Sequence, residues 1–211
     1  MTDARANWIK PPGPVAAGLR IGLLGGSFNP AHEGHLHVSD VALKRLGLDY
    51  IWWLVSPQNP LKPEHGMASL DERLACARQI TSHSPQIRVT DIEAQLGTRY
   101  TIDAVTQLTR RFPMPRFVWL MGSDNLMTFH RWRNWQALAH RIPIAVVIRP
   151  GTALAPLVSK AARYLASFKV SDERSLAATR PPAFAILDAR RNAASATAIR
   201  ARVLAGATNI C

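Results

Sequence analysis

The chain has 211 residues, of which 47% are hydrophobic, so it is long and apolar enough to form one domain with a sizeable core. Its 26 Lys and Arg residues exceed its 14 Asp and Glu residues, which gives a formal charge of +12. This composition excludes a disordered tail and a mini-protein, and no apolar stretch is long enough to span a membrane. The charge favours a polyanionic partner such as a nucleotide or nucleic acid, although a solvated basic surface is an equal alternative.

Residues 1–19 are predicted to form a flexible N-terminal arm, because prolines and scattered polar residues give neither a helix nor a strand period. We expect residues 20–211 to form a single domain. The arm lacks the apolar core of a signal peptide, and Cys76 and Cys211 provide neither a disulfide framework nor a metal-ligand spacing. The chain is therefore expected to be cytoplasmic.

A glycine-rich segment with two histidines follows the first predicted strand, residues 21–24. We interpret residues 25–35, with the sequence GGSFNPAHEGH, as a glycine turn that leads into a helix from about Glu33 to Leu46, ended by Gly47. Unpaired N–H groups at a helix N-terminus attract anions. The segment is therefore predicted to bind phosphate.

His32 and His35 allow three interpretations. They are three residues apart, whereas zinc-binding histidines on a helix are typically four apart around a glutamate, so a metal site is disfavoured. They could simply cap the helix start. The preferred interpretation is that both rings donate N–H bonds to an anion.

The rest of the chain continues to alternate strands and helices. We predict strands at residues 50–55, 87–89, 116–121, 144–148 and 183–187. Predicted helices cover about 69–82, beginning with a Ser69–Glu72 capping box, then 101–112 capped by Thr101, 123–138 and 156–168, with a loop at 171–182. This order indicates an α/β fold with a doubly wound parallel sheet. In such sheets ligands bind beyond the carboxyl ends of the strands, here after residues 24, 55 and 121.

Near the C-terminus, residues 192–200 are predicted to open a short helix. Ser195 or Thr197 could be its N-cap. Arg200 lies in its first turns, where a cation is unfavourable unless an anion binds at the terminus. A second phosphate site is therefore an even alternative to simple capping.

The two motifs together resemble those of the HxGH-type nucleotidylyltransferases. The first is Gly26-Ser27-Phe28-Asn29-Pro30-x-His32-x-Gly34-His35, and the second is Ser195-x-Thr197-x-Ile199-Arg200. Within this family, Tyr100-Thr101 and residues 121–132 are similar to the bacterial nicotinate-nucleotide adenylyltransferases. Asn29 departs from the pattern, since many relatives have Asp there. The resemblance implies a Rossmann-like fold with a small C-terminal helical portion.

The resemblance also implies a reaction, in which the adenylyl group of ATP passes to nicotinate mononucleotide and diphosphate leaves. The partners would be these two nucleotides, with neither nucleic acid nor a membrane. Mg²⁺ would bridge the phosphates and be held mainly by substrate oxygens and water, with no protein metal site. Adenylyl transfer to nicotinamide mononucleotide or another phosphate acceptor is the enzyme alternative, and a basic nucleic-acid-binding domain is the non-enzyme alternative.

The same resemblance assigns roles to individual residues. On the ATP side, His32 and His35 would act with Gly26, Ser27 and Phe28 on the phosphates, Asp124 would contact the adenosine, and Ser195, Thr197 and Arg200 would hold the leaving diphosphate. His32, His35 and Arg200 would be the catalytic residues. On the mononucleotide side, Trp132 would stack on the pyridine ring, Thr101 would orient the carboxylate, and Lys62 and Arg149 would supply positive charge. Trp132 could instead be core packing, and Asp124 a helix N-cap.

Overall fold

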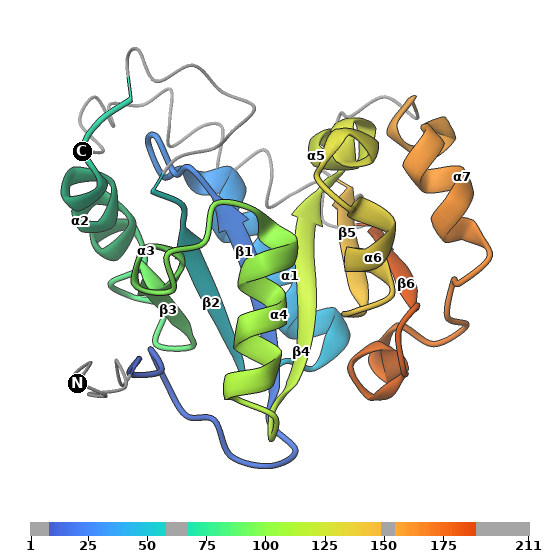
Figure 1. The fold of residues 1–211 in the computed structure, drawn as a ribbon, viewed down its shortest axis with the longest axis horizontal. Helices are drawn as coiled ribbons and strands as arrows, with labels where there is room; N and C mark the ends of the chain where they lie inside the picture. Colours follow the sequence, from blue (N-terminus) through green and yellow to red (C-terminus); the bar gives the residue numbers. More distant parts are fainter. Residues whose placement is uncertain (1–8, 58–66, 149–154, 189–211) are drawn as a thin grey trace, which may run out of the picture.

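The computed structural model describes residues 9–57, 67–148 and 155–188. Within these residues, six parallel strands form one sheet in the order β3-β2-β1-β4-β5-β6 (Figure 1). The strands are β1 (Arg20–Gly26), β2 (Tyr50–Val55), β3 (Ile87–Thr90), β4 (Arg116–Gly122), β5 (Ile144–Ile148) and β6 (Phe184–Asp188). The predicted doubly wound parallel sheet is confirmed.

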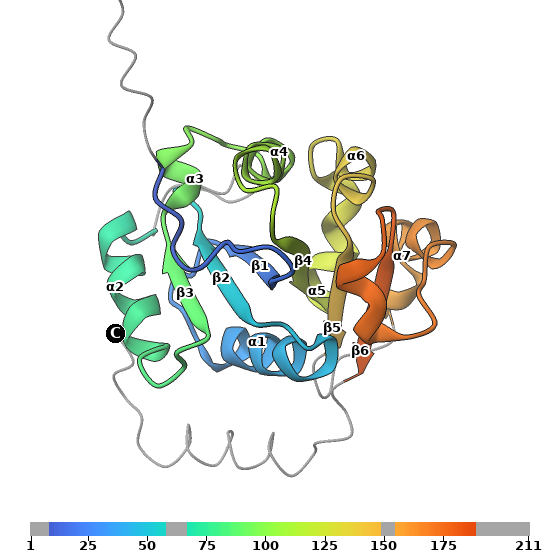
Figure 2. The ribbon, with the colours of Figure 1, turned by 90° about the horizontal axis from the view of Figure 1, so that it is seen from below.

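Helices cover both faces of this sheet (Figure 2). On one face lie α1 (Glu33–Leu46), α2 (Leu70–Ile80) and the 3-10 helix η3 (Glu173–Ala178). On the other lie α3 (Ile92–Gln95), α4 (Thr101–Arg111), α5 (Ser123–Thr128), the 3-10 helix η1 (Phe129–Arg131), α6 (Trp135–Ala139) and α7 (Lys160–Ala166), which follows the 3-10 helix η2 (Ala155–Val158). The central strands are apolar on both sides because both sides are buried.

Local signals set the bounds of the two helices on the first face. The α2 helix begins at the predicted capping box, in which the Glu72 N–H donates to Ser69 Oγ and the Ser69 N–H donates to Glu72 Oε2. The α1 helix ends at Gly47, whose φ of 63° is the left-handed conformation that glycine adopts without strain. Both ends agree with the sequence prediction.

Three predictions of local structure are wrong. Gly25 and Gly26 are strand residues rather than a turn, so β1 ends two residues later than predicted. Thr101 is the first residue of α4 and not its cap, which is Tyr100. The predicted loop at 171–182 contains η3, and α3 was not predicted at all. Such short helices have too few residues to show a period.

The segment before β1 lies along the end of the sheet at which the strands begin (Figure 1). Ile9, Val15 and Leu19 pack against the core on the α4 side. Residues 1–8 lie outside the described residues, so the predicted arm stays a prediction. Cys76 on α2 is disulfide-bonded, which the cysteine spacing did not predict. In the described ranges, no helix combines the length and apolar character needed to cross a bilayer.

Candidate active site

A cavity of about 480 Å³ opens at the carboxyl ends of β1 and β4, within the size range of small-molecule sites. Eight residues predicted from the sequence line it, and they come from four separate segments of the chain. They are Gly26, Ser27, Phe28, His32, His35, Thr101, Asp124 and Trp132. The fold thus brings these predicted residues together around one space, at the end of the sheet where ligands of such folds bind.

The two histidines form a capping box at the start of α1. The Gly34 N–H donates to His32 Nδ1 at 3.1 Å, and the His32 N–H donates to His35 Nδ1 at 3.2 Å. Because both Nδ1 atoms accept a backbone hydrogen bond, each neutral ring carries its proton on Nε2. The capping interpretation is therefore correct, and it fixes which ring nitrogen of each histidine is the donor.

Aromatic packing holds His35 in place. The Phe28 ring is buried and stacks on Trp53 at a centroid distance of 4.9 Å, and it contacts the His35 ring at 4.6 Å. Phe28 has a φ of 46°, an unusual conformation for a residue with a side chain. Such strain costs about 1–3 kcal/mol and persists where the surroundings enforce it, often at functional sites.

A close approach of two strands explains Gly25, the first residue of the glycine-rich segment. A Cβ atom on Gly25 would lie 2.5 Å from Trp119 Cη2, so a side chain at this position would displace the buried Trp119 ring. Trp119 itself lines the cavity. Gly25 is therefore required by packing between β1 and β4, and not by a turn.

A buried arginine on α2 hydrogen-bonds the segments that follow β1 and β2 and the segment that precedes α2. Arg73 is 3% exposed and donates to the carbonyl oxygens of Ser27 and Ser56, each at 2.7 Å. It also donates to the carbonyls of Pro57 and Ala68, each at 3.0 Å. Burial lowers the pKa of Arg73 from its usual value, because it disfavours the charged form. The hydrogen bonds to four carbonyl oxygens offset the cost of burying the charged guanidinium.

Aromatic and basic side chains form another part of the cavity wall. Trp132 is half-buried, with its edge contacts to Trp119 and Phe129 at 6.1 and 5.3 Å between ring centroids. It packs on the core and also lines the cavity, so the core-packing interpretation is confirmed, and stacking on the pyridine ring stays a prediction. The Arg133 guanidinium lies 4.5 Å from the centroid of the Tyr100 ring, a cation–π contact.

An acidic side chain, Glu93 on α3, also lines the cavity. It is 7% exposed, and burial raises the pKa of its carboxyl group, while a hydrogen bond with the Ser56 side chain partly opposes this effect. In the parts of the chain that the structure describes, no Lys, Arg or His nitrogen lies within the 4.0 Å of an ion pair with it. Burying a carboxyl group without a neighbouring cation lowers the stability of the folded protein.

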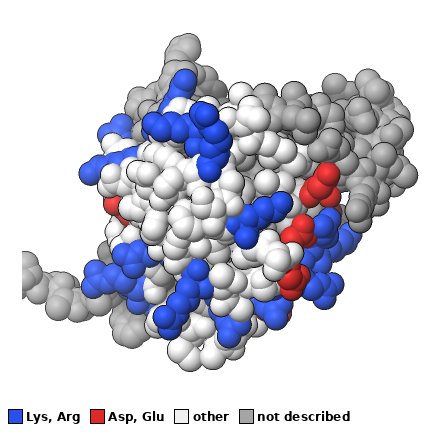
Figure 3. Space-filling model, turned by 90° about the vertical axis from the view of Figure 1, so that its right-hand side faces the viewer, with Lys and Arg blue, Asp and Glu red and all other residues white. Residues whose placement is uncertain are grey.

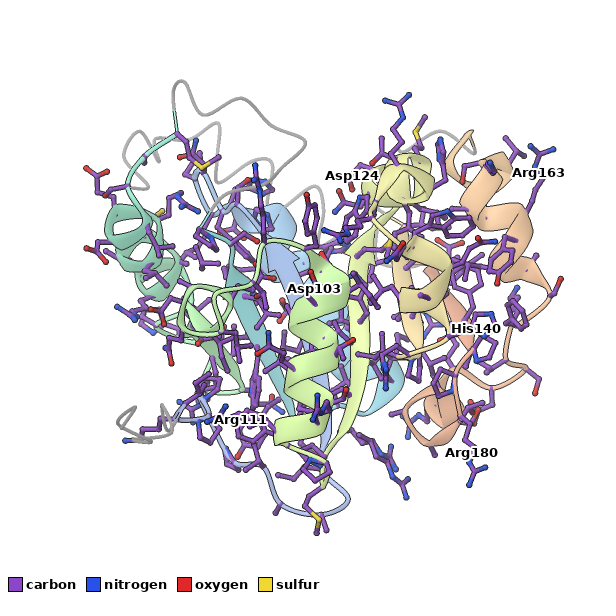
Figure 4. All side chains as sticks on the ribbon, in the orientation of Figure 1. Asp103, Arg111, Asp124, His140, Arg163 and Arg180 are labelled. Atoms are coloured by element: carbon purple, nitrogen blue, oxygen red, sulfur yellow. The ribbon has the colours of Figure 1, made fainter. Side chains whose placement is uncertain are left out.

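Asp124 lies in the first turn of α5, at the end of the sheet where the cavity opens, whereas Arg111 and Arg180 lie toward the opposite end (Figure 4). The N-cap of α5 is Gly122, so the alternative that Asp124 is the N-cap is wrong. Its carboxylate is exposed and faces the cavity. An acidic group in a first turn is favoured by the helix dipole.

Five predicted site residues lie outside the described residues: Lys62, Arg149, Ser195, Thr197 and Arg200. Their roles stay predictions. Within the described residues, no three His, Cys, Asp or Glu side chains are grouped as a metal site. The positive charge is distributed: Figure 3 shows one face on which Lys and Arg side chains stand in separate groups, with uncharged surface between them.

Several cavity residues were not predicted from the sequence. They are Trp119, Glu93, Arg99, Arg131 and Arg133. Arg73, which was not predicted either, contacts the cavity residue Ser27 through its carbonyl. Arg73 had a readable signal, because it occupies the same helix face as Leu70, Leu74 and Ala77, where a charged residue needs buried partners. The three arginines near Trp132 and Tyr100 add positive charge to that wall.

Known proteins match the chain over most of its length. The model of the cytidylyltransferase-like family matches residues 23–202. A relative from Parvibaculum lavamentivorans, named "Probable nicotinate-nucleotide adenylyltransferase", is 54% identical over 89% of this chain and 94% of its own. A relative of the same name from Cereibacter sphaeroides strain ATCC 17025 is 52% identical over 86% and 96%.

A solved structure shares the fold. The nicotinic acid mononucleotide adenylyltransferase of Plasmodium falciparum, complexed with NaAD, aligns with a TM-score of 0.62 at 16% identity and covers 81% of this chain and 75% of its own. At that identity the likeness concerns the fold alone. The function rests on the closer relatives, whose match spans nearly their whole length. The chain therefore belongs to the cytidylyltransferase-like family and, within it, to the nicotinate-nucleotide adenylyltransferases.

Proposed function

We propose that this protein transfers the adenylyl group of ATP to nicotinate mononucleotide, giving nicotinate adenine dinucleotide and diphosphate in NAD biosynthesis. The observation that carries the proposal is that one cavity is lined both by His32 and His35 of the phosphate motif and by Thr101 and Trp132, the residues assigned to the mononucleotide. Its close relatives carry the name of this activity.

The phosphate side would act through fixed N–H donors. The capping box directs the proton of each neutral ring to Nε2, so His32 and His35 can donate to oxygens of the triphosphate. The attacking phosphate of the mononucleotide is already anionic and needs no general base. Catalysis then consists of holding two anions in line and stabilising the charge on the α-phosphate and the leaving diphosphate. Ser195, Thr197 and Arg200 would hold that diphosphate.

The acceptor side would position the pyridine nucleotide. Trp132 would stack on the ring, and Thr101 would orient the nicotinate carboxylate at the N-terminus of α4. The arginines of this wall, Arg99, Arg131 and Arg133, favour nicotinate mononucleotide over nicotinamide mononucleotide, because only the acid carries a carboxylate in addition to its phosphate. Lys62 and Arg149 would add charge near the phosphates, and Asp124 would contact the adenosine.

Mg²⁺ would be held by phosphate oxygens and water. The donor set fits this arrangement, because the histidine side of the cavity offers N–H donors suited to phosphate, and Mg²⁺ prefers oxygen ligands. When bound, the ion neutralises charge on the phosphates. We place the reaction in the cytoplasm, where ATP is available, and cell fractionation tests that location.

The test is diphosphate release by the purified full-length protein with ATP, Mg²⁺ and nicotinate mononucleotide. Parallel reactions replace the acceptor by nicotinamide mononucleotide, or omit Mg²⁺ in the presence of a chelator. We expect a higher kcat/KM for the acid than for the amide, and no turnover without Mg²⁺. Diphosphate release with a different phosphate acceptor only would overturn the proposal, as would salt-sensitive binding to oligonucleotides without any turnover.

A further inference from the structure

The buried carboxyl group of Glu93 has no role in the reaction as derived above. The cavity is otherwise suited to anions, with histidine and arginine donors, yet Glu93 lies in its wall at 7% exposure. It has no ion-pair partner among the described residues. A protein that only needed to fill this space would be more stable with a neutral side chain there.

Hydrogen bonds place Glu93 beside the acceptor wall. The Thr98 N–H and the Thr98 hydroxyl donate to the Glu93 carbonyl oxygen at 3.0 and 3.2 Å, which fixes the turn that leads to Tyr100 and Thr101. The Glu93 side chain hydrogen-bonds Ser56. Since Arg73 holds the Ser56 carbonyl, the carboxyl group is anchored on a rigid part of the site.

The chemistry of a carboxylate limits what it can contact in this cavity. It accepts about four hydrogen bonds, and the Ser56 hydroxyl accounts for one. Phosphates and the nicotinate carboxylate would repel it, so its partners must be uncharged donors of the substrates. A nucleotide offers hydroxyl groups on the ribose and, in adenosine, the amino group of the base. Glu93 adjoins the Thr101 turn, whereas Asp124 on α5 faces the proposed adenosine side.

We propose that the Glu93 carboxylate binds the acceptor mononucleotide by accepting hydrogen bonds from its ribose hydroxyls. The inference rests on the proposed function, since it concerns the acceptor of that reaction. It gives the cavity two kinds of recognition, in which the basic groups bind the charged parts of the mononucleotide and Glu93 binds its sugar. It also explains why a carboxyl group is kept in a position where it does not help folding.

The experiment combines substrate analogues with variants. Steady-state kinetics are measured with nicotinate mononucleotide and its 2′-deoxy and 3′-deoxy analogues, for the wild type, Glu93→Gln and Glu93→Ala. Glu173→Gln, at a position not among the cavity residues, is the matched control. The KM for ATP is recorded for every protein, and the melting temperature of each is measured without substrate.

For the wild type we expect at least one deoxy analogue to lose about 10- to 100-fold in kcat/KM, the range for a hydrogen bond to a charged group. In Glu93→Gln and Glu93→Ala the natural acceptor should lose a similar factor. The further loss on removing the hydroxyl should be less than about 3-fold, because its partner is already altered. The KM for ATP and the melting temperature of Glu93→Gln should not be impaired. Glu173→Gln should behave as the wild type toward all acceptors.

The inference is overturned if the wild type uses both deoxy analogues as well as the natural acceptor, a result that needs no folded variant. It is also overturned if Glu93→Gln raises the KM for ATP alone, or lowers the melting temperature without changing the analogue response. Absence of turnover with nicotinate mononucleotide itself would overturn the proposed function as well. Full turnover with no discrimination between analogues would overturn only the role of Glu93.

Discussion

The two sides of the cavity are built differently. The phosphate side, residues 26–35, is held by contacts close in sequence, since His32 and His35 cap their own helix and Phe28 packs on His35. The acceptor side joins a turn at residues 93–101 to Trp132 and its neighbouring arginines, Arg131 and Arg133, which lie at least thirty residues later in the sequence. The comparison indicates that the proposed phosphate side is preorganised locally, whereas the proposed acceptor side is assembled by the tertiary fold.

The largest expected effect concerns Arg73 on α2, which contacts the phosphate side from a distant part of the sequence through the carbonyl of Ser27. Arg73→Met removes the donor for four carbonyl oxygens, including those of Ser27 and Ser56. We expect it to lower the free energy of unfolding by about 3–5 kcal/mol, as for other broken buried polar networks. Denaturant unfolding measures this. Arg78→Met, on the exposed side of the same helix, is the control and should cost less than about 0.5 kcal/mol. Equal losses in the two variants would contradict the role of Arg73.

The second prediction tests the local preorganisation of the phosphate side. His35→Ala removes the Nε2–H donor that we propose binds the phosphates. It should raise the activation free energy by about 3 kcal/mol, which lowers kcat by roughly two powers of ten, with a smaller effect on KM. His83→Ala, which changes an exposed histidine after α2, should leave kcat unchanged. A folded His35→Ala protein with the kcat of the wild type would refute the assigned role.

This difference between the two sides also explains what the sequence could predict. The capping boxes, the apolar strands and the phosphate motif depend on residues within one turn or one strand, so their patterns are readable. The function of Gly25 was not readable, because the reason for it is the Trp119 ring on a strand more than ninety residues later. A pair of glycines before a helix predicts a turn unless the neighbouring strand is known.

The acceptor side was less predictable for the same reason. Trp132 and Thr101 were found through a family resemblance, and their meeting around one cavity follows from the order of β1 and β4 in the sheet. Glu93 gave no signal, because a glutamate in a polar segment after β3 is normally exposed. Its burial results from the contact of α3 with the end of β2, which no local pattern encodes.

The third prediction tests the acceptor side directly. Trp132→Ala should raise the KM for nicotinate mononucleotide by about 10-fold, from loss of about 1–1.5 kcal/mol of stacking, and leave the KM for ATP unchanged. Trp132→Phe should retain most of the affinity because it keeps a flat ring. The control is Trp135→Ala, which removes ring contacts to Phe129 and Tyr164 outside the cavity. It should lower the melting temperature without changing either KM. If Trp132→Ala raised the KM for ATP instead, Trp132 would belong to the ATP side of the cavity and its assignment to the acceptor side would be wrong.

The smallest expected effect is on the pH dependence of stability. It compares the buried carboxyl group of Glu93, on the acceptor side, with that of Glu72, in the capping box of α2. Burial raises the pKa of Glu93 above the ordinary value of a glutamate, so the folded protein holds the Glu93 proton more tightly than the unfolded chain does. The resulting stabilisation is complete below the unfolded pKa and is lost as the pH rises through the folded pKa. Glu93→Gln should therefore gain stability relative to the wild type as the pH rises from about 4 to about 8.

Glu72→Gln should show the opposite sign. Hydrogen bonds from Ser69 lower the pKa of Glu72, so its contribution is present above the unfolded pKa and is lost as the pH falls through the folded pKa. Glu72→Gln should accordingly be less stable than the wild type near neutral pH, with a difference that shrinks in acid. Melting temperatures of the three proteins without substrate, measured across this pH range, test both signs. If the two variants shifted in the same direction, folding would stabilise the Glu93 carboxylate as it does that of Glu72, and burial would not be the dominant influence on the Glu93 carboxyl group.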